Sequence, residues 1–259
     1  MDIMEHKCMD SNKLLNDRKE KIGDIPIRIL YKGDLQAASQ NGCILFYHGL
    51  GASKDIQSKE LVDLANSGFL AVGVDNVGHG DRVFADFKER FSENNPERVK
   101  NIVSAVSETA SEINILINWL TDRQILQNNK LGIVGISMGA FIAYAIPMFD
   151  NRFKTMVAIL GSPLWQDSPE SPHNKITFYS KLSLLSLNAA KDNIVPAEHA
   201  KEFHLKLKNK YSDYEKRFKY IEYPNSGHFM EEDEWYECWN ECLKWFKNRM
   251  TLSFASGSQ

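Results

Sequence analysis

Short apolar runs alternate with longer amphipathic stretches along most of this chain. The runs that predict β-strands cover residues 25–31, 43–47, 70–74, 131–134, 155–160, 182–187 and 218–223. Several are apolar at nearly every position, which is typical of parallel strands that are covered on both faces of a sheet. We therefore expect an α/β fold with a mostly parallel central sheet of about eight strands flanked by helices.

Two helical patterns stand out between and after these runs. Apolar residues recur at the 3.6-residue period from Val99 to Leu120, which predicts one long amphipathic helix. A similar pattern runs from Trp235 to Phe246, and four acidic residues at 231–234 precede it. Acidic side chains are favoured at the positive end of the helix dipole, so we interpret this cluster as a helix start and not as a metal site.

Two segments interrupt the alternation, and both follow predicted strands. Residues 81–98 are polar and irregular, and residues 161–181 contain three prolines. Because α/β folds carry binding loops after their strands, we expect 161–181 to form a short cap and 81–98 a second active-site insertion. No linker or internal repeat separates them, so we expect a single domain over 1–259.

Aromatic residues near these loops are candidates for the walls of a substrate site, although packing over the sheet would explain them equally well. The candidate substrate-binding residues are Trp165, Phe178, Tyr179 and Phe229. Three phenylalanines of the first insertion, Phe84, Phe87 and Phe91, could add a further apolar wall.

Composition and charge exclude several classes of protein. The 259 residues include 31 basic and 34 acidic side chains, a formal net charge of −3, which argues against a broad nucleic-acid-binding face. No apolar run approaches the roughly 20 residues needed to span a bilayer. The first twenty residues are charged throughout, so we expect no secretory signal, no stable membrane association and a cytoplasmic location.

Four cysteines, Cys8, Cys43, Cys238 and Cys242, are too few and too scattered for a disulfide scaffold. Cys43 opens an apolar run and is expected to be a core residue. Cys238 and Cys242 share one face of the last predicted helix, as a metal-binding pair would. No further soft ligand lies nearby in the sequence, so we expect both to be buried and predict no metal site.

The strongest chemical signal is the sequence Gly-Ile-Ser-Met-Gly at positions 135–139. It follows an apolar strand directly and precedes a helical run, the context of a sharp turn that exposes a nucleophilic serine above the sheet. Small residues are needed on both sides of Ser137 in so tight a turn. We predict Ser137 to be a nucleophile, the alternative being an ordinary glycine-flanked turn.

A serine hydroxyl needs a neighbouring base, and that base needs a carboxylate partner. Of the seven histidines, His228 lies between the last strand and the last helix, at the same sheet edge as Ser137. Asp192 follows the strand at 182–187, whereas its competitor Asp167 precedes that strand and Glu198 lies within a helix. We predict His228 as base and Asp192 as its partner, the alternatives being a helix-entry or surface histidine and a plain turn or cap aspartate.

The tetrahedral oxyanion of acyl transfer is usually stabilised by backbone N–H groups. One would come from Met138, directly after the nucleophile. The loop His48-Gly49-Leu50-Gly51 follows the strand at 43–47, and its glycines allow close approach of the backbone, so Leu50 would supply the second. We interpret His48 as structural.

Together, these motifs resemble the α/β-hydrolase superfamily over residues 25–246. They comprise Gly-x-Ser-x-Gly, His48-Gly49, the Asp-Asn-Val-Gly-His-Gly stretch at 75–80, Asp192 and Gly227-His228. The chain looks most like the small single-domain carboxylesterases and the related dienelactone-hydrolase-like and peptidase-like serine hydrolases. The resemblance implies that His79 is architectural. Dienelactone hydrolases proper use cysteine as nucleophile, and hormone-sensitive-lipase-like esterases carry His-Gly-Gly-Gly in place of the loop found here.

We therefore expect a cytoplasmic serine carboxylesterase that cleaves short-chain carboxylic esters through an acyl-enzyme intermediate, as a monomer or homodimer. No cofactor, metal or nucleic acid is expected, and the partner is a small-molecule ester. Two other classes stay open. One is a thioesterase or small peptidase that uses the same residues, and the other is a binding protein with a silent triad.

Overall fold

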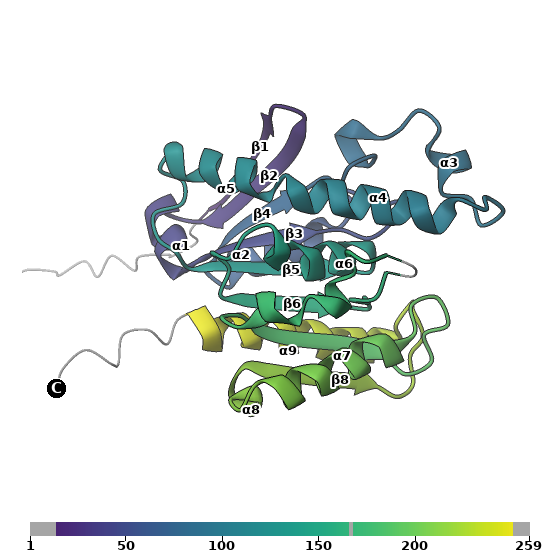
Figure 1. Cartoon of the computed structure of the whole chain (residues 1–259). Coiled ribbons are helices and arrows are strands. Elements are labelled where there is room, and N and C mark those ends of the chain that lie inside the picture. The colour runs from purple at the N-terminus through teal and green to yellow at the C-terminus, as the bar shows by residue number, and fades with distance from the viewer. Residues whose placement is uncertain (1–13, 166–167, 251–259) are drawn as a thin grey trace, which may run out of the picture.

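One eight-stranded sheet forms the centre of the computed structural model, which describes residues 14–165 and 168–250 (Figure 1). The strand order is β1-β2-β4-β3-β5-β6-β7-β8, and only the contacts β1–β2 and β2–β4 are antiparallel. This confirms the predicted α/β fold with a mostly parallel sheet. The strands are β1 (Leu15–Ile22), β2 (Ile25–Lys32), β3 (Cys43–Tyr47), β4 (Leu70–Val74), β5 (Leu131–Ile136), β6 (Thr155–Ile159), β7 (Ser183–Ala189) and β8 (Phe218–Tyr223).

Helices cover both faces of the sheet, so two hydrophobic cores result. One core holds apolar residues of α1 (Leu35–Asn41), α4 (Arg98–Ser111), α5 (Ile113–Asp122), α6 (Met138–Ala145) and α7 (Ala197–Lys210). The other holds those of α2 (Ser58–Asn66) and α9 (Glu232–Met250). Two single-turn helices, α3 (Phe87–Arg90) and α8 (Tyr214–Arg217), lie in the connections.

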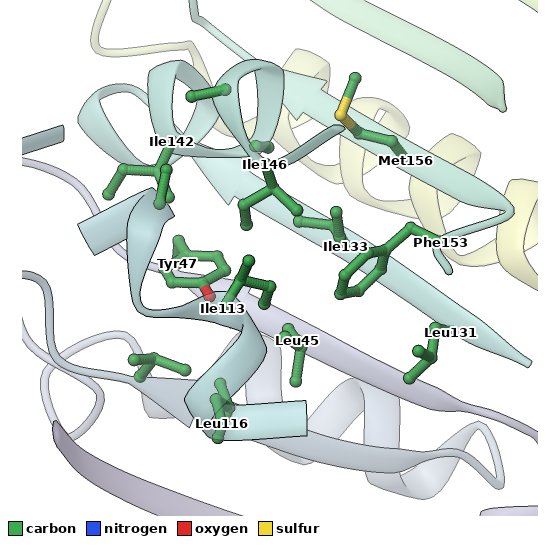
Figure 2. Close-up of a cluster of buried hydrophobic side chains, with 14 of the residues drawn as sticks. Leu45, Tyr47, Ile113, Leu116, Leu131, Ile133, Ile142, Ile146, Phe153 and Met156 are labelled. Carbon is green, nitrogen blue, oxygen red and sulfur yellow. The ribbon is translucent and has the colours of Figure 1, made fainter. Parts of the chain in front are cut away.

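Branched and aromatic side chains of the central strands fill the first core. Figure 2 shows Leu45 and Tyr47 of β3 beside Leu131 and Ile133 of β5, facing Ile113 of α5. These side chains are at most 1% exposed. Strands buried on both faces explain why β3, β4 and β5 are apolar at nearly every position.

The apolar pattern does not predict strand β1, because most of its residues are charged. Exposed residues alternate with half-buried ones along this strand, and only its last residue, Ile22, is buried. It is an edge strand, held by an antiparallel ladder to β2 and by ion pairs. Arg28 contacts Asp17 at 2.6 Å, and Lys19 contacts Asp55 at 2.9 Å. Charges on an edge strand also discourage pairing with other chains.

The single long helix predicted from Val99 to Leu120 is wrong in one respect, since the structure divides it into α4 and α5 at Glu112. The backbone of Glu112 stays helical, with φ −73° and ψ −8°. Its carboxylate accepts two hydrogen bonds from Arg82, at 2.6 and 2.7 Å. The break therefore coincides with a tie to the loop that follows β4.

The burial predicted for three cysteines is confirmed: Cys43, Cys238 and Cys242 are fully buried, and burial raises the pKa of each thiol. Cys8 lies outside the described residues. None of the helices in the described ranges is both long and apolar enough to cross a membrane.

Candidate active site

The turn from β5 into α6 carries Ser137 at the carboxyl edge of the sheet. Ser137 has φ +53° and ψ −117°, a conformation that few residues other than glycine adopt. Its N–H donates to Ile159 O at 2.8 Å, which fixes the turn to the neighbouring strand β6. The side chain is half-buried and lines a cavity.

The two glycines that flank this serine are required by close backbone contact. A Cβ on Gly135 would overlap the carbonyl group of Gly139. A Cβ on Gly139 would in turn overlap the carbonyl group of Tyr47, the last residue of β3, and would lie 2.9 Å from His48 O. The helix α6 therefore begins pressed against both β5 and β3, which brings its first N–H groups near the loop after β3.

Three residues from three different connections meet beside Ser137 in a continuous hydrogen-bonded chain. Ser137 Oγ lies 2.8 Å from His228 Nε2, and His228 Nδ1 lies 2.7 Å from Asp192 Oδ2. Their side chains come from the carboxyl ends of β5, β8 and β7. The structure thus brings together the three residues that the sequence singled out, 91 and 36 positions apart along the chain.

Asp192 is held on both of its oxygens. While Oδ2 contacts His228, Oδ1 accepts the backbone N–H groups of Ile194 at 2.9 Å and Val195 at 2.8 Å. The carboxylate is 1% exposed and the His228 side chain 10% exposed. Asp192 is therefore a turn aspartate and the partner of His228 at the same time, and the turn fixes the direction of its second oxygen.

The loop after β3 presents one peptide group to the same place. Gly49 O accepts two hydrogen bonds, from His48 Nδ1–H at 2.8 Å and from Ala52 N–H at 3.1 Å. Because the C=O and N–H of a trans peptide point in opposite directions, fixing Gly49 O also fixes the N–H of Leu50. Leu50 and Met138 both line the cavity beside Ser137.

His48 ties this loop to the next one. Its Nε2 accepts the N–H of Asn76 at 3.1 Å, so Nδ1 carries the proton and the ring is neutral. Burial lowers the pKa of His48 to about 4. Gln57 Oε1 accepts the N–H of Gly49 at 2.9 Å from the other side. The loop after β3 is therefore held by hydrogen bonds from both sides.

A buried ion pair anchors the neighbouring loop. Lys54 Nζ, whose side chain is 1% exposed, lies 2.8 Å from Asp75 Oδ2 and 2.6 Å from Asp81 Oδ2. Asp75 also accepts the backbone N–H groups of Lys54 and Asp81, both at 2.9 Å. These bonds satisfy the charges that burial would otherwise leave costly.

The phenylalanines of the first insertion, which could have added an apolar wall, do not line the cavity. His79 is buried, with the rings of Phe87 and Phe91 centred 4.9 and 5.6 Å from its own, and Phe84 stacks on Phe91. Burial lowers the pKa of His79. These aromatic rings pack against the loop that follows β4 and not against Ser137.

A cavity of about 360 Å³ opens beside Ser137. One face of α4 forms a wall of it through Val99, Ile102 and Val103. Most of the other lining residues are apolar as well, and its polar lining residues besides Ser137 are Arg98, Ser162, Asn193 and His199. Ligand sites in proteins commonly have volumes of about 300–1,000 Å³, so this cavity is small.

Of the four predicted wall residues, the structure places only Trp165 in the lining of this cavity. The predictions for Phe178 and Tyr179 are wrong: Tyr179 is fully buried and donates to Tyr144 O at 2.5 Å, and Phe178 lines a different cavity with Pro147. Phe229 lies beside His228 but is 87% exposed. Of the described residues of the predicted cap, Ser162, Leu164 and Trp165 at its beginning line the cavity.

A second serine–histidine pair lines the same cavity. Ser162 Oγ lies 3.3 Å from His199 Nδ1, and it also contacts the N–H and the carbonyl oxygen of Leu164 at 3.0 and 3.2 Å. Within the described residues no carboxylate contacts His199. Ser162 is 1% exposed. A buried hydroxyl with its bonds taken by a turn is poorly placed to attack a substrate.

The remaining predicted competitors take no part in this arrangement or lie outside the described residues. Glu198 is exposed in the first turn of α7. Asp167 and His6 lie outside the described residues.

Several residues of the site had no signal in the sequence. Gln57 precedes α2 and Lys54 lies in a polar loop, where neither differs from an ordinary surface residue. Helix α4 was recognised as amphipathic, but its periodicity alone does not tell that its first turns face the cavity. Gly49 and Gly51, by contrast, indicate in the sequence that the loop after β3 approaches the site.

Comparison with known proteins identifies a hydrolase family and esterase relatives. The dienelactone hydrolase family matches residues 34–250. The Bacillus subtilis (strain 168) protein named "Putative esterase YitV" is 24% identical over 230 residues, covering 75% of this chain and 88% of that protein. Esterase YjfP of Escherichia coli (strain K12) is 24% identical over 149 residues, covering 58% of this chain and 56% of its own.

Among solved structures, TT1662 from Thermus thermophilus is similar in fold. It superposes with a TM-score of 0.75 at 20% identity, covering 92% of this chain and 98% of that one.

Proposed function

The chain belongs to the dienelactone hydrolase family, and from this premise we propose that it is a serine hydrolase that cleaves short-chain carboxylic esters. Family membership and the esterase relatives support a hydrolase of esterase type. The observation that carries the finer proposal is the hydrogen-bonded chain from Ser137 through His228 to Asp192, with distances of 2.8 and 2.7 Å.

In this mechanism His228 Nε2 takes the proton of Ser137 while Oγ attacks the ester carbonyl. Asp192 holds the imidazole with Nδ1 protonated and stabilises the positive charge that forms on it. The N–H groups of Leu50 and Met138 donate to the oxyanion. Met138 is the first residue of α6, where N–H groups have no acceptor within the helix.

The tetrahedral intermediate collapses as His228 gives its proton to the leaving alcohol, and Ser137 is left as an acyl ester. Water then attacks this ester while His228 takes its proton. The bond from the acyl carbon to Ser137 Oγ breaks as His228 returns a proton to Oγ, and the carboxylic acid is released. Each step uses only side chains and backbone groups of the site described above.

Labelling with a fluorophosphonate tests both the activity and the identity of the nucleophile. We expect one label per chain, located by peptide mass spectrometry on Ser137. A label on Ser162 would overturn the assignment, because that serine lines the same cavity and has its own histidine neighbour.

Substitution gives the matching kinetic test with p-nitrophenyl butyrate. Ser137→Ala should lower kcat by about a thousandfold or more, and His228→Ala by a similar factor. The double variant should lose little further activity, because the two residues act as one unit. The exposed Ser180→Ala is the matched control and should keep wild-type kcat. Activity of Ser137→Ala above a tenth of wild type would contradict the proposal.

A further inference from the structure

The surroundings of Ser137 differ on its two sides. The cavity of about 360 Å³ is lined by Ser137 and by Leu50 and Met138, and its walls come from α4, α6 and residues 193–196 before α7. Neither His228 nor Phe229 is among the described residues that line this cavity. The cavity therefore reaches Ser137, while His228 and Phe229 stand outside its lining.

The chemistry of the proposed mechanism divides the substrate between these sides. In acylation, the bond from Ser137 Oγ to the carbonyl carbon forms and the bond from that carbon to the alcohol oxygen breaks. The proton of Ser137 passes to His228 Nε2 and then to the departing oxygen. The acyl group stays on Ser137, while the alcohol oxygen must lie within hydrogen-bond reach of His228. The alcohol part thus occupies the side of His228, and the acyl part fits the cavity.

A large aromatic side chain is exposed to solvent next to His228, where the alcohol leaves. Phe229 is 87% exposed, and its ring centre lies 5.7 Å from that of His228 at an interplanar angle of 87°. Ile194, which lines the cavity and is 54% exposed, adds apolar surface next to Asp192, to which its N–H donates. Exposed apolar residues grouped at a functional site are informative, because water contact of such surface is unfavourable.

We propose that Phe229 determines specificity for the leaving alcohol, so that the enzyme prefers esters of aromatic or bulky apolar alcohols. This inference rests on the proposed ester hydrolysis. An aromatic alcohol would pack against the Phe229 ring as the ester bond is placed between Ser137 and His228. The ring contributes to acylation, in which the alcohol is present, and not to deacylation, in which it has left.

The experiment compares benzyl butyrate with ethyl butyrate, which share their acyl group and are both esters of simple primary alcohols. The measured quantity is the ratio of kcat/KM for the two esters. Phe229→Ala should lower the benzyl-to-ethyl ratio about five- to tenfold, and Phe229→Trp should retain it. Phe178→Ala is the matched control, because it removes a 46% exposed phenylalanine from a different cavity and should leave the ratio unchanged.

A reciprocal variant separates the two sides of the site. Ile102→Ala enlarges the cavity and should shift the preferred acyl length of p-nitrophenyl esters upward without changing the benzyl-to-ethyl ratio. Phe229→Ala should keep the wild-type acyl-length preference. The role of Phe229 would be overturned if Phe229→Ala left the benzyl-to-ethyl ratio unchanged, or if Ile102→Ala lowered this ratio by the same factor. Either result would leave the proposed ester hydrolysis standing. If wild-type protein hydrolyses none of these esters, the proposed function fails and the assignment with it.

Discussion

Ser137 has an unfavourable backbone conformation, and its neighbours hold it there. A residue other than glycine at φ +53° and ψ −117° costs on the order of 1–3 kcal/mol. The hydrogen bond from its N–H to Ile159 O and the tight approach of Gly135 to Gly139 leave the turn no relaxed alternative. The strain places the hydroxyl above the strand ends, 2.8 Å from His228.

Gln57 is expected to act on catalysis through the oxyanion loop. Its Oε1 accepts the N–H of Gly49, so Gln57→Leu should loosen the His48–Gly49 peptide, which precedes the peptide that carries the N–H of Leu50, and should lower kcat about tenfold. This loss is smaller than the roughly 100- to 1,000-fold loss in kcat that is typical when a hydrogen-bond donor to the oxyanion is itself removed. KM and the melting temperature should change little.

The conservative variant separates positioning from general damage at this residue. Gln57→Glu keeps an oxygen acceptor at the same distance and should retain most of the wild-type kcat. Equal losses in the two variants would show that the contact to Gly49 is not what matters.

At the scale of elements, the contact between α6 and β3 decides whether the site can form. Gly139→Ala should lower the free energy of unfolding by about 3 kcal/mol or more, because its Cβ would overlap the Tyr47 carbonyl and backbone cannot yield as a side-chain end can. Chemical denaturation measures this. Gly49→Ala is the control: its Cβ would lie 3.6 Å from Ile136 O, an ordinary contact, so its stability should stay within about 0.5 kcal/mol of wild type.

Helix α4 is expected to limit the length of the acyl group. Each methylene contributes about 0.8 kcal/mol only while the cavity of about 360 Å³ has room for it. The kcat/KM of p-nitrophenyl esters should therefore rise from acetate to about butyrate or hexanoate and then fall. A steady rise to palmitate, or a jump in rate above the solubility limit of the ester, would favour a lipase instead.

At the scale of the whole molecule, buried neutral histidines make stability depend on pH. His204 accepts or donates at 2.8 Å to Ser186 Oγ and at 2.9 Å to Tyr214 OH, and burial lowers its pKa to about 3. Burial likewise lowers the pKa of His48 to about 4. In the unfolded chain both would titrate near 6.5.

The free energy of unfolding should therefore fall as the pH drops from about 6.5 to 4.5. In that window the unfolded chain binds more protons than the native state, with a limiting slope of about 1.4 kcal/mol per pH unit for each histidine. Urea denaturation at pH 7, 6 and 5 measures this slope. Paired carboxylates such as Asp17 and Asp55, whose pKa values are lowered from 3.8, titrate below the window. A stability that is flat from pH 7 to 5 would contradict the prediction.

Local sequence patterns are enough to predict which loops gather at the site. Short apolar runs that alternate with helical stretches predict a mostly parallel sheet, and the carboxyl ends of parallel strands share one edge. Ser137, Asp192 and His228 each directly follow such a strand or lie in the loop after it, so local patterns were enough to bring them together. The turn at Ser137 was readable for the same reason, because its glycines are needed within five residues of one another.

The surroundings of Ser137, His228 and Asp192 depend instead on packing between segments that are far apart in the sequence. Periodicity marks a helix as amphipathic, but which turns of α4 face the cavity depends on how it packs against α6. Tyr179 lies in the core and Phe229 in solvent, although both are aromatic residues in loops. Strand β1 has too few apolar residues to predict, and its place follows from pairing with β2. Packing between distant segments decides whether a residue is buried or exposed, and the chemistry of a single residue does not determine this.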